Sequence, residues 1–113
     1  MAIPVFKSQS VALSTTNRTT IYTTPSLSRA VITSIIIANV DASSATTVKL
    51  EFFDASASTH FALTGSKSIA TNDFLVISDS PIYFDTGDLL SATAGAADDI
   101  TVTAFVEEYS TGF

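Results

Sequence analysis

The chain contains no cysteine and no tryptophan, and only four of its 113 residues are glycine. Without cysteine it can form no disulfide, no thiolate nucleophile and no zinc–thiolate site. A chain of this length can bury somewhat under ~70% of the surface that its unfolded form exposes. The sequence therefore predicts one domain with an apolar core that needs no covalent or metal staple.

Positive charge is also scarce, with 5 Lys and Arg residues against 11 Asp and Glu residues and a net charge of −6. The basic residues form no run; they are Lys7, Arg18, Arg29, Lys49 and Lys67. Contacts to nucleic-acid phosphates need several basic side chains close together, and an acidic surface disfavours anionic membranes. We therefore expect neither nucleic acid nor a membrane as a partner.

Long hydrophobic runs are absent, although 46% of the residues are hydrophobic. No apolar run approaches the ~20 residues that a membrane-spanning helix needs. The first ten residues, MAIPVFKSQS, lack the basic region and long apolar core of a signal peptide. We expect a protein made and used in the cytoplasm, unless something else carries it out.

Short strands separated by turn residues fill the sequence. The segment AVITSIIIANV (30–40) is rich in β-branched residues, and its three consecutive isoleucines place apolar groups on both faces of a strand. The segment TVKLEFF (47–53) alternates apolar and charged residues, and with the preceding strand it is typical of a β-hairpin with a longer loop. Further strands are expected near 19–24, 60–64, 74–78, 81–85, 89–94 and 100–109.

Turn signals recur every 8–12 residues or so, which is typical of an all-β sandwich or barrel. No window shows a helical period with helix caps. The predicted fold class is all-β: an antiparallel β-sandwich or jelly-roll-like domain of about eight strands. The expected division is an N-terminal arm over residues 1–10 and a single sandwich domain over residues 11–113.

The N-terminal segment combines Pro4, which weakens a central strand, with side chains too apolar for a free tail. We expect Ile3, Val5 and Phe6 to be buried against another chain, by addition of a strand to an edge on the partner. An edge strand of its own domain is the alternative. The outer face of the isoleucine strand is the second expected interface, represented by Ile35 and Ile37.

One motif suggests catalysis. In YFDTGD (83–88) the order Asp-Thr-Gly resembles the aspartic protease motif, in which two carboxylates share a proton. Asp88 would disturb such a site, and a turn between two strands accounts for the same residues. The lone histidine, His60, has no G-x-S-x-G nucleophile elbow to serve. We therefore expect no enzyme activity and no catalytic residue.

Acidic residues recur in the predicted turns, and Ca²⁺ takes carboxylates from loops. The residues are Asp41, Asp54, Asp73, Asp85, Asp88, Asp98 and Asp99. Their spacing matches no EF-hand loop, and Asp is itself a common turn residue. No metal or other cofactor is predicted, and calcium binding in these turns stays an open alternative.

The order of these pieces resembles small virion structural proteins of tailed bacteriophages. The group shows a T-x-x-T-I-Y-T-x-P strand, an I/L-x-x-A-N strand, a V-x-V-x-x-x-D strand, an L-x-L-x-x-G-D-x-L-x-A-x-A hairpin and a closing strand ending x-E-Y/I-S. The corresponding segments here are 19–25, 35–39, 48–54, 82–94 and 106–110. The resemblance covers nearly the whole chain and treats DTGD as a hairpin turn.

This resemblance implies a non-enzymatic capsid cement or decoration protein. Such a protein stabilises the phage head by binding the major capsid protein, as a homotrimer at a capsid three-fold point. Its expected location is the virion, assembled in the host cytoplasm. The alternative is a small neck, tail or baseplate or fibre component that binds a receptor or carbohydrate.

Overall fold

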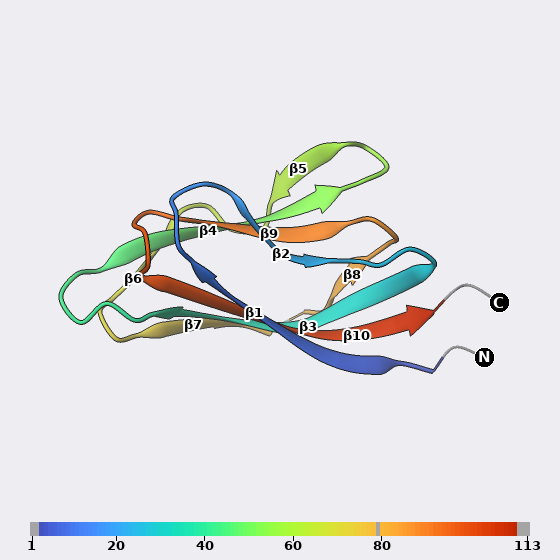
Figure 1. Ribbon diagram of the computed structural model, residues 1–113, viewed down its shortest axis with the longest axis horizontal. Helices are drawn as coiled ribbons and strands as arrows, with labels where there is room; N and C mark the ends of the chain where they lie inside the picture. The colour runs from blue at the N-terminus through green and yellow to red at the C-terminus, as the bar shows by residue number, and fades with distance from the viewer. Residues whose placement is uncertain (1–2, 79, 111–113) are drawn as a thin grey trace.

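The chain folds as two antiparallel β-sheets packed face to face, and Figure 1 shows the two layers almost edge-on. The computed structural model describes residues 3–78 and 80–110, and their regular structure consists of ten strands. Within these residues there is no helix of a length and apolarity that would cross a membrane. The predicted all-β antiparallel sandwich is confirmed.

Sheet A forms the lower layer of Figure 1. Its order is β1, β10 and β3, and the far edge of β3 is covered by two short strands, β7 and β8. The bounds are β1 Val5–Leu13, β3 Ser28–Asn39, β7 Phe74–Ile77, β8 Ile82–Phe84 and β10 Ile100–Ser110.

Sheet B forms the upper layer and repeats the same plan. Its order is β2, β9 and β4, and the far edge of β4 is covered by the short strands β5 and β6. The bounds are β2 Thr19–Thr23, β4 Thr46–Asp54, β5 Thr59–Ala62, β6 Lys67–Ile69 and β9 Leu89–Ala94. In each sheet, therefore, one edge of a long strand, β3 or β4, pairs with two short strands that follow each other along it.

The core lies between the sheets and is made by alternate residues of the long strands. On β10, Ile100, Val102 and Ala104 point inward and are buried. On β3 the alternation breaks at Thr33, which has no partner because Ser34 pairs with Phe105 while Ile32 pairs with Val106. This β-bulge lets Ile32 and Ile35 both face the core although they lie three residues apart.

The predicted hairpin between 30–40 and 47–53 is wrong, because β3 belongs to sheet A and β4 to sheet B. The connection crosses from one layer to the other around Asn39, which is 2% exposed. Its Nδ2 donates to the carbonyl oxygens of Ser44, Ile69 and Ala70 at 3.0–3.2 Å. Its Oδ1 accepts from the backbone N–H of Asp41 at 2.9 Å. One buried amide thus satisfies three backbone carbonyl groups and one backbone N–H at the corner between the layers.

The N-terminal segment takes the alternative form in the single chain. From Val5 onward it is not a separate arm but strand β1, paired antiparallel with β10 from Val5 opposite Glu108 to Leu13 opposite Ile100. The first six residues of β1 are exposed, and only Leu13 is fully buried. The division at residue 10 therefore falls inside one continuous strand.

Candidate interaction surface

The five residues predicted at an interface fall into two groups. Ile3, Val5 and Phe6 are 77%, 54% and 74% exposed, so they are free to contact another chain, and their role stays a prediction. Ile35 and Ile37 are fully buried between the two sheets, so the prediction that these two side chains meet a partner is wrong. The outward-facing member of the triplet is Ile36, which is partly exposed.

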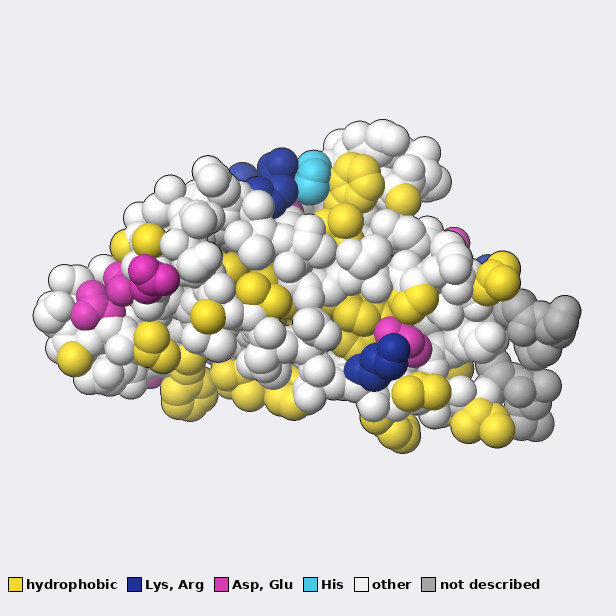
Figure 2. Space-filling model, in the orientation of Figure 1, with side chains coloured by type: hydrophobic (Ala, Val, Ile, Leu, Met, Phe, Trp, Pro, Cys, Tyr) yellow, Lys and Arg dark blue, Asp and Glu magenta, His cyan; other side chains and the backbone are white. Residues whose placement is uncertain are grey.

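The outer side of sheet A carries a set of apolar residues that we call the apolar face: Val31, Ile36, Phe74, Val76, Tyr83 and Phe105. The strand register brings its members together in cross-strand pairs, because Ile36 lies opposite Val76 and Val31 lies opposite Tyr83. Three of its members are strongly exposed: Phe74 at 63%, Val76 at 44% and Tyr83 at 73%. In Figure 2 hydrophobic side chains line the lower margin of the view, along sheet A. Contiguous exposed apolar surface of this kind marks interaction sites.

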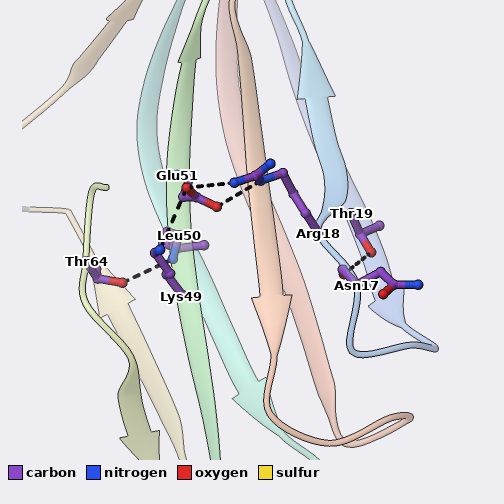
Figure 3. A network of polar contacts seen from close by, with 7 residues as sticks. All are labelled: Asn17, Arg18, Thr19, Lys49, Leu50, Glu51 and Thr64. Carbon is purple, nitrogen blue, oxygen red and sulfur yellow. Dashed lines mark hydrogen bonds and ion pairs between the residues drawn. The ribbon is translucent and has the colours of Figure 1, made fainter. Parts of the chain in front are cut away.

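The outer side of sheet B carries a network of polar contacts (Figure 3), although Phe61 and Leu63 at the β5 edge of that sheet are 50% and 37% exposed. The Nε and Nη2 of Arg18 donate to the two carboxylate oxygens of Glu51 at 2.9 and 3.1 Å. The Nζ of Lys49 lies 3.9 Å from the same carboxylate. The hydrogen bonds from Arg18 lower the pKa of Glu51, against the opposite effect of its burial. Figure 2 shows Lys or Arg side chains beside the histidine along the top of the view, over this layer.

A second polar cluster joins the layers beside β1. The hydroxyl of Tyr22 on β2 donates to Glu108 Oε2 on β10 at 2.5 Å, and Lys7 Nζ on β1 lies 2.9 Å from Glu108 Oε1. Burial alone would raise the pKa of Glu108, but the hydrogen bonds from Tyr22 and Lys7 lower it overall. Burial, followed by the bond to Glu108, raises the pKa of the Tyr22 hydroxyl. The cluster therefore holds a carboxylate and a neutral phenol and ties β1 and β10 to the opposite sheet.

The DTGD segment is a turn, as the structural interpretation predicted, but it joins the two layers instead of forming a hairpin, since β8 lies in sheet A and β9 in sheet B. The carboxylate of Asp88 accepts from the backbone N–H groups of Ala55 and Asp85 at 2.9 and 2.8 Å. Gly87 supplies the positive φ of 85°. Asp85 is exposed and lies 3.5 Å from Arg29. Both carboxylates thus have backbone or ionic partners, and they form no pair sharing a proton.

The other candidate groups also have structural explanations. The ring of His60 packs against Phe53 with centroids 4.7 Å apart. Within residues 3–78 and 80–110 no three His, Cys, Asp or Glu side chains are placed to hold a metal ion. Two of the turn aspartates do lie near each other: burial, followed by the nearby negative charge of Asp41, raises the pKa of Asp99.

The interface prediction from sequence missed most of the apolar face. The available signal was the pattern of short apolar runs, since FLVI on β7 and IYF on β8 carry apolar side chains on both sides of a strand. The isoleucine triplet likewise predicts a strand with two apolar faces. The prediction assigns Ile35 and Ile37 to the outer face, but these two side chains are buried and Ile36 faces outward. The bulge at Thr33 changes which residues of β3 face out, and no local signal in the sequence marks it.

No protein-family model matches the chain, and no curated protein matches it in sequence. Solved structures do match its fold. One comes from the appendages of Bacillus endospores, described as disulfide-linked pili, with 12% identity and a TM-score of 0.58 over 99% of this chain and 92% of that chain. Another comes from the acid-stable capsid of Helicobacter pylori bacteriophage KHP30, with 13% identity and a TM-score of 0.55 over 99% and 95%.

A third match is the virus-like particle of extra small virus from the prawn Macrobrachium rosenbergii, with 16% identity and a TM-score of 0.51 over 99% of this chain and 81% of that chain. At these identities the matches show a shared fold. They agree with the two-sheet architecture and extend over nearly the whole chain.

Proposed function

We propose that this chain is a non-enzymatic structural protein of a phage particle: a capsid cement or decoration protein that binds the major capsid protein. The observation that carries the proposal is the difference between the two outer sides of the sandwich. The outer side of sheet A presents Phe74, Val76 and Tyr83 to solvent, whereas that of sheet B carries the ion pairs around Glu51. A subunit that lies on a larger particle needs one side to bury and one side to remain in water.

The fold matches support this proposal. The matched structures come from a phage capsid, a virus-like particle and pili, all of which are built from many protein subunits. The resemblance of the sequence to small virion proteins is a separate argument for the same class.

The expected arrangement is three copies around a capsid three-fold point, each lying on the capsid through the apolar face. Residues 1–10 would extend each contact, because Ile3, Val5 and Phe6 are exposed at the end where β1 begins. Burying one such side chain contributes roughly 1.5–3 kcal/mol.

The alternative, a neck, tail, baseplate or fibre component that binds a receptor or carbohydrate, also has an observation in its favour. Tyr83 and Tyr109 line a hollow of about 350 Å³ on sheet A, with Arg29 between them in the lining. Arg29 is paired with Asp85, so aromatic rings lie close to a carboxylate and a guanidinium. Exposed aromatics beside a carboxylate are the arrangement that a sugar site needs.

Binding to purified particles tests the main proposal. Particles assembled from the capsid protein encoded with this chain would be mixed with it and separated on a density gradient. The wild type should sediment with the particles. Val76→Lys should weaken binding at least tenfold, because a charge would be buried in an apolar contact.

Thr47→Lys is the matched control, because Thr47 is exposed on the outer side of sheet B. It should bind like the wild type. A wild-type chain that stays at the top of the gradient contradicts the proposal. Binding to an immobilised glycan that is lost in Tyr83→Ala would favour the alternative instead.

A further inference from the structure

The four sheet edges of the sandwich differ in how well they are protected. Sheet B ends on one side at β2, which has five residues and a register shift, and on the other at β5 and β6, which have four and three residues. The far edge of sheet A is divided between β7 and β8, with four and three residues. Short, bulged or interrupted edges are poor templates for another strand.

The remaining edge, β1, is long and regular. It has nine residues, pairs with β10 without a register shift, and has no other described strand on its outer side. Alternate residues of β1 therefore direct N–H and C=O groups away from the sheet. A lysine often blocks such an edge, but the half-exposed side chain of Lys7 is held by Glu108, with Nζ 2.9 Å from Oε1, and its charge is compensated there.

A second copy of the chain offers a matching edge. Among the described edges, only another β1 is long enough to pair along most of a nine-residue strand. An antiparallel contact between two identical strands is isologous, so it closes after two copies. In β1, odd-numbered and even-numbered side chains lie on opposite faces of the sheet. The inner and outer faces of the two copies therefore align only when odd-numbered residues lie opposite odd-numbered residues and even-numbered opposite even-numbered.

Three registers near the middle of β1 satisfy this condition. Each has a centre, the residue that lies on the two-fold axis and faces its own copy. The side chains that face each other distinguish the three registers. A centre at Lys7 would place two lysines opposite each other, which is unfavourable. A centre at Gln9 would place Lys7 opposite Val11 and Val5 opposite Leu13, whose side chain is already buried in its own core.

A centre at Ser8 avoids both problems and matches three of its four kinds of facing pair, the exception being Phe6 with Ser10. Val5 then lies opposite Val11, Lys7 opposite Gln9, Phe6 opposite Ser10, and Ser8 opposite its own copy. The β-branched pair and the polar pairs are favourable across antiparallel strands. This register uses residues 5–11 and leaves Ala12 and Leu13, which lead into the connection to β2.

We propose that β1 pairs antiparallel with β1 of a second copy, centred on Ser8, and joins the two copies of sheet A into one continuous sheet. The contact uses the backbone edge of β1 and not the apolar face, so it does not depend on binding to a capsid, although Val5 and Phe6 take part in both proposals. Where copies are seated on a particle, it would link neighbouring positions across a two-fold axis.

Single-cysteine variants test the register, because the natural chain has no cysteine to interfere. In Ser8→Cys the two Cα atoms would lie about 4.5–5.5 Å apart, within the range of a disulfide. In Gln9→Cys they would be offset by two residues and lie roughly 8 Å apart, which is beyond that range. Oxidation should cross-link Ser8→Cys into a covalent dimer and leave Gln9→Cys and the exposed control Thr33→Cys without a cross-link. Dimers from Gln9→Cys alone, or none from any variant, overturn the proposed register.

Charge variants test the interface without oxidation, with mass followed by sedimentation over a concentration series. The wild type should approach twice the 11.8 kDa of one chain. Ser8→Lys and Ser8→Asp should each weaken the dimer severalfold, and an equimolar mixture of the two should restore it, because opposite charges then face each other. Thr47→Lys, on the exposed outer side of sheet B, should behave like the wild type.

A wild-type chain that stays monomeric up to about 1 mM, or that forms trimers, overturns the inference. Failure of Ser8→Lys and Ser8→Asp to form a mixed dimer does the same. A dimer that binds no particle contradicts the proposed function alone, so the two outcomes are distinguishable.

Discussion

Tyr22 and Glu108 lie on different sheets, and a hydrogen bond of 2.5 Å from the tyrosine hydroxyl to the glutamate carboxylate joins them. They are 86 residues apart in the sequence and only 7% and 8% exposed. Lys7 completes the cluster from the edge strand β1. The strand that carries the proposed contact between copies is therefore held to its own domain by side chains as well as by its pairing with β10.

Removing the tyrosine hydroxyl should destabilise the fold. Tyr22→Phe leaves the ring packed against Phe84 but takes a donor away from a buried carboxylate, and a hydrogen bond to a charged group contributes about 1.5–3 kcal/mol. We expect a loss of that size in the free energy of unfolding, measured with urea. Tyr83→Phe, which changes an exposed tyrosine, should stay within ~0.5 kcal/mol of the wild type. Equal effects of the two variants would contradict this role for the cluster.

Stability should also fall in acid because of Glu108. Its folded-state pKa is lowered by Tyr22 and Lys7, so it binds a proton less readily when folded than when unfolded. The stabilisation is present above the unfolded pKa of about 4.3 and is lost as the pH falls through the lower folded pKa.

In Glu108→Gln this part of the pH dependence should disappear. The measurement is the difference in unfolding free energy between wild type and variant from pH 7 to pH 2, which cancels the contributions of Glu51, Asp41 and Asp54, whose pKa values are also lowered. The difference should shrink as the pH falls below about 4.3. A difference that is constant across the range would show that Glu108 does not titrate in this way.

The buried amide at the corner between the layers should be among the most sensitive positions. Asn39→Ala removes four hydrogen bonds from a buried corner, and of the three carbonyl groups only that of Ala70 keeps a described partner, the N–H of Asp73, outside the strand ladders, so roughly 3 kcal/mol or more should be lost. Asn17→Ala is the matched control, because Asn17 is exposed, and it should change the melting temperature little. If Asn39→Ala and Asn17→Ala have the same melting temperature, the corner between the layers does not depend on the Asn39 amide.

The fold class could be predicted from the sequence because alternation and turn residues are local signals. The strands near 74–78, 89–94 and 100–109 were expected almost where they lie. The assignment of strands to layers is not local, which is why the sequence predicts a hairpin between the segments 30–40 and 47–53 and the structure does not contain it. Asn39 decides that point through carbonyl groups of residues 69 and 70, which are distant in the sequence.

The candidate site was harder to predict than the fold. Alternation correctly indicated that the isoleucine strand has two apolar faces, but it does not say which face is the inner one. The pairing of β3 with β7 and β8 brings Ile36, Val76 and Tyr83 together, and only the three-dimensional register reveals it. Composition alone predicts a contact to another chain at Val5 and Phe6, and that contact stays a prediction, whereas the open edge of β1 depends on where every other strand lies.

The two aspartates of the DTGD turn should respond differently to the same substitution. Asp88 is 5% exposed, and its oxygens accept from the N–H groups of Ala55 and Asp85, so Asp88→Asn places an amide donor where only an acceptor fits. A loss of about 1–3 kcal/mol in unfolding free energy is expected. Asp85 is exposed and accepts from its neighbour Thr86 at the surface, so Asp85→Asn should leave the protein folded and its assembly intact.

Thermal melts of the two variants and a peptide-cleavage assay of the wild type check this together. Cleavage that vanishes in Asp85→Asn would mean that the segment is a catalytic motif after all, and an Asp88→Asn variant as stable as the wild type would show that its buried carboxylate does not hold the turn.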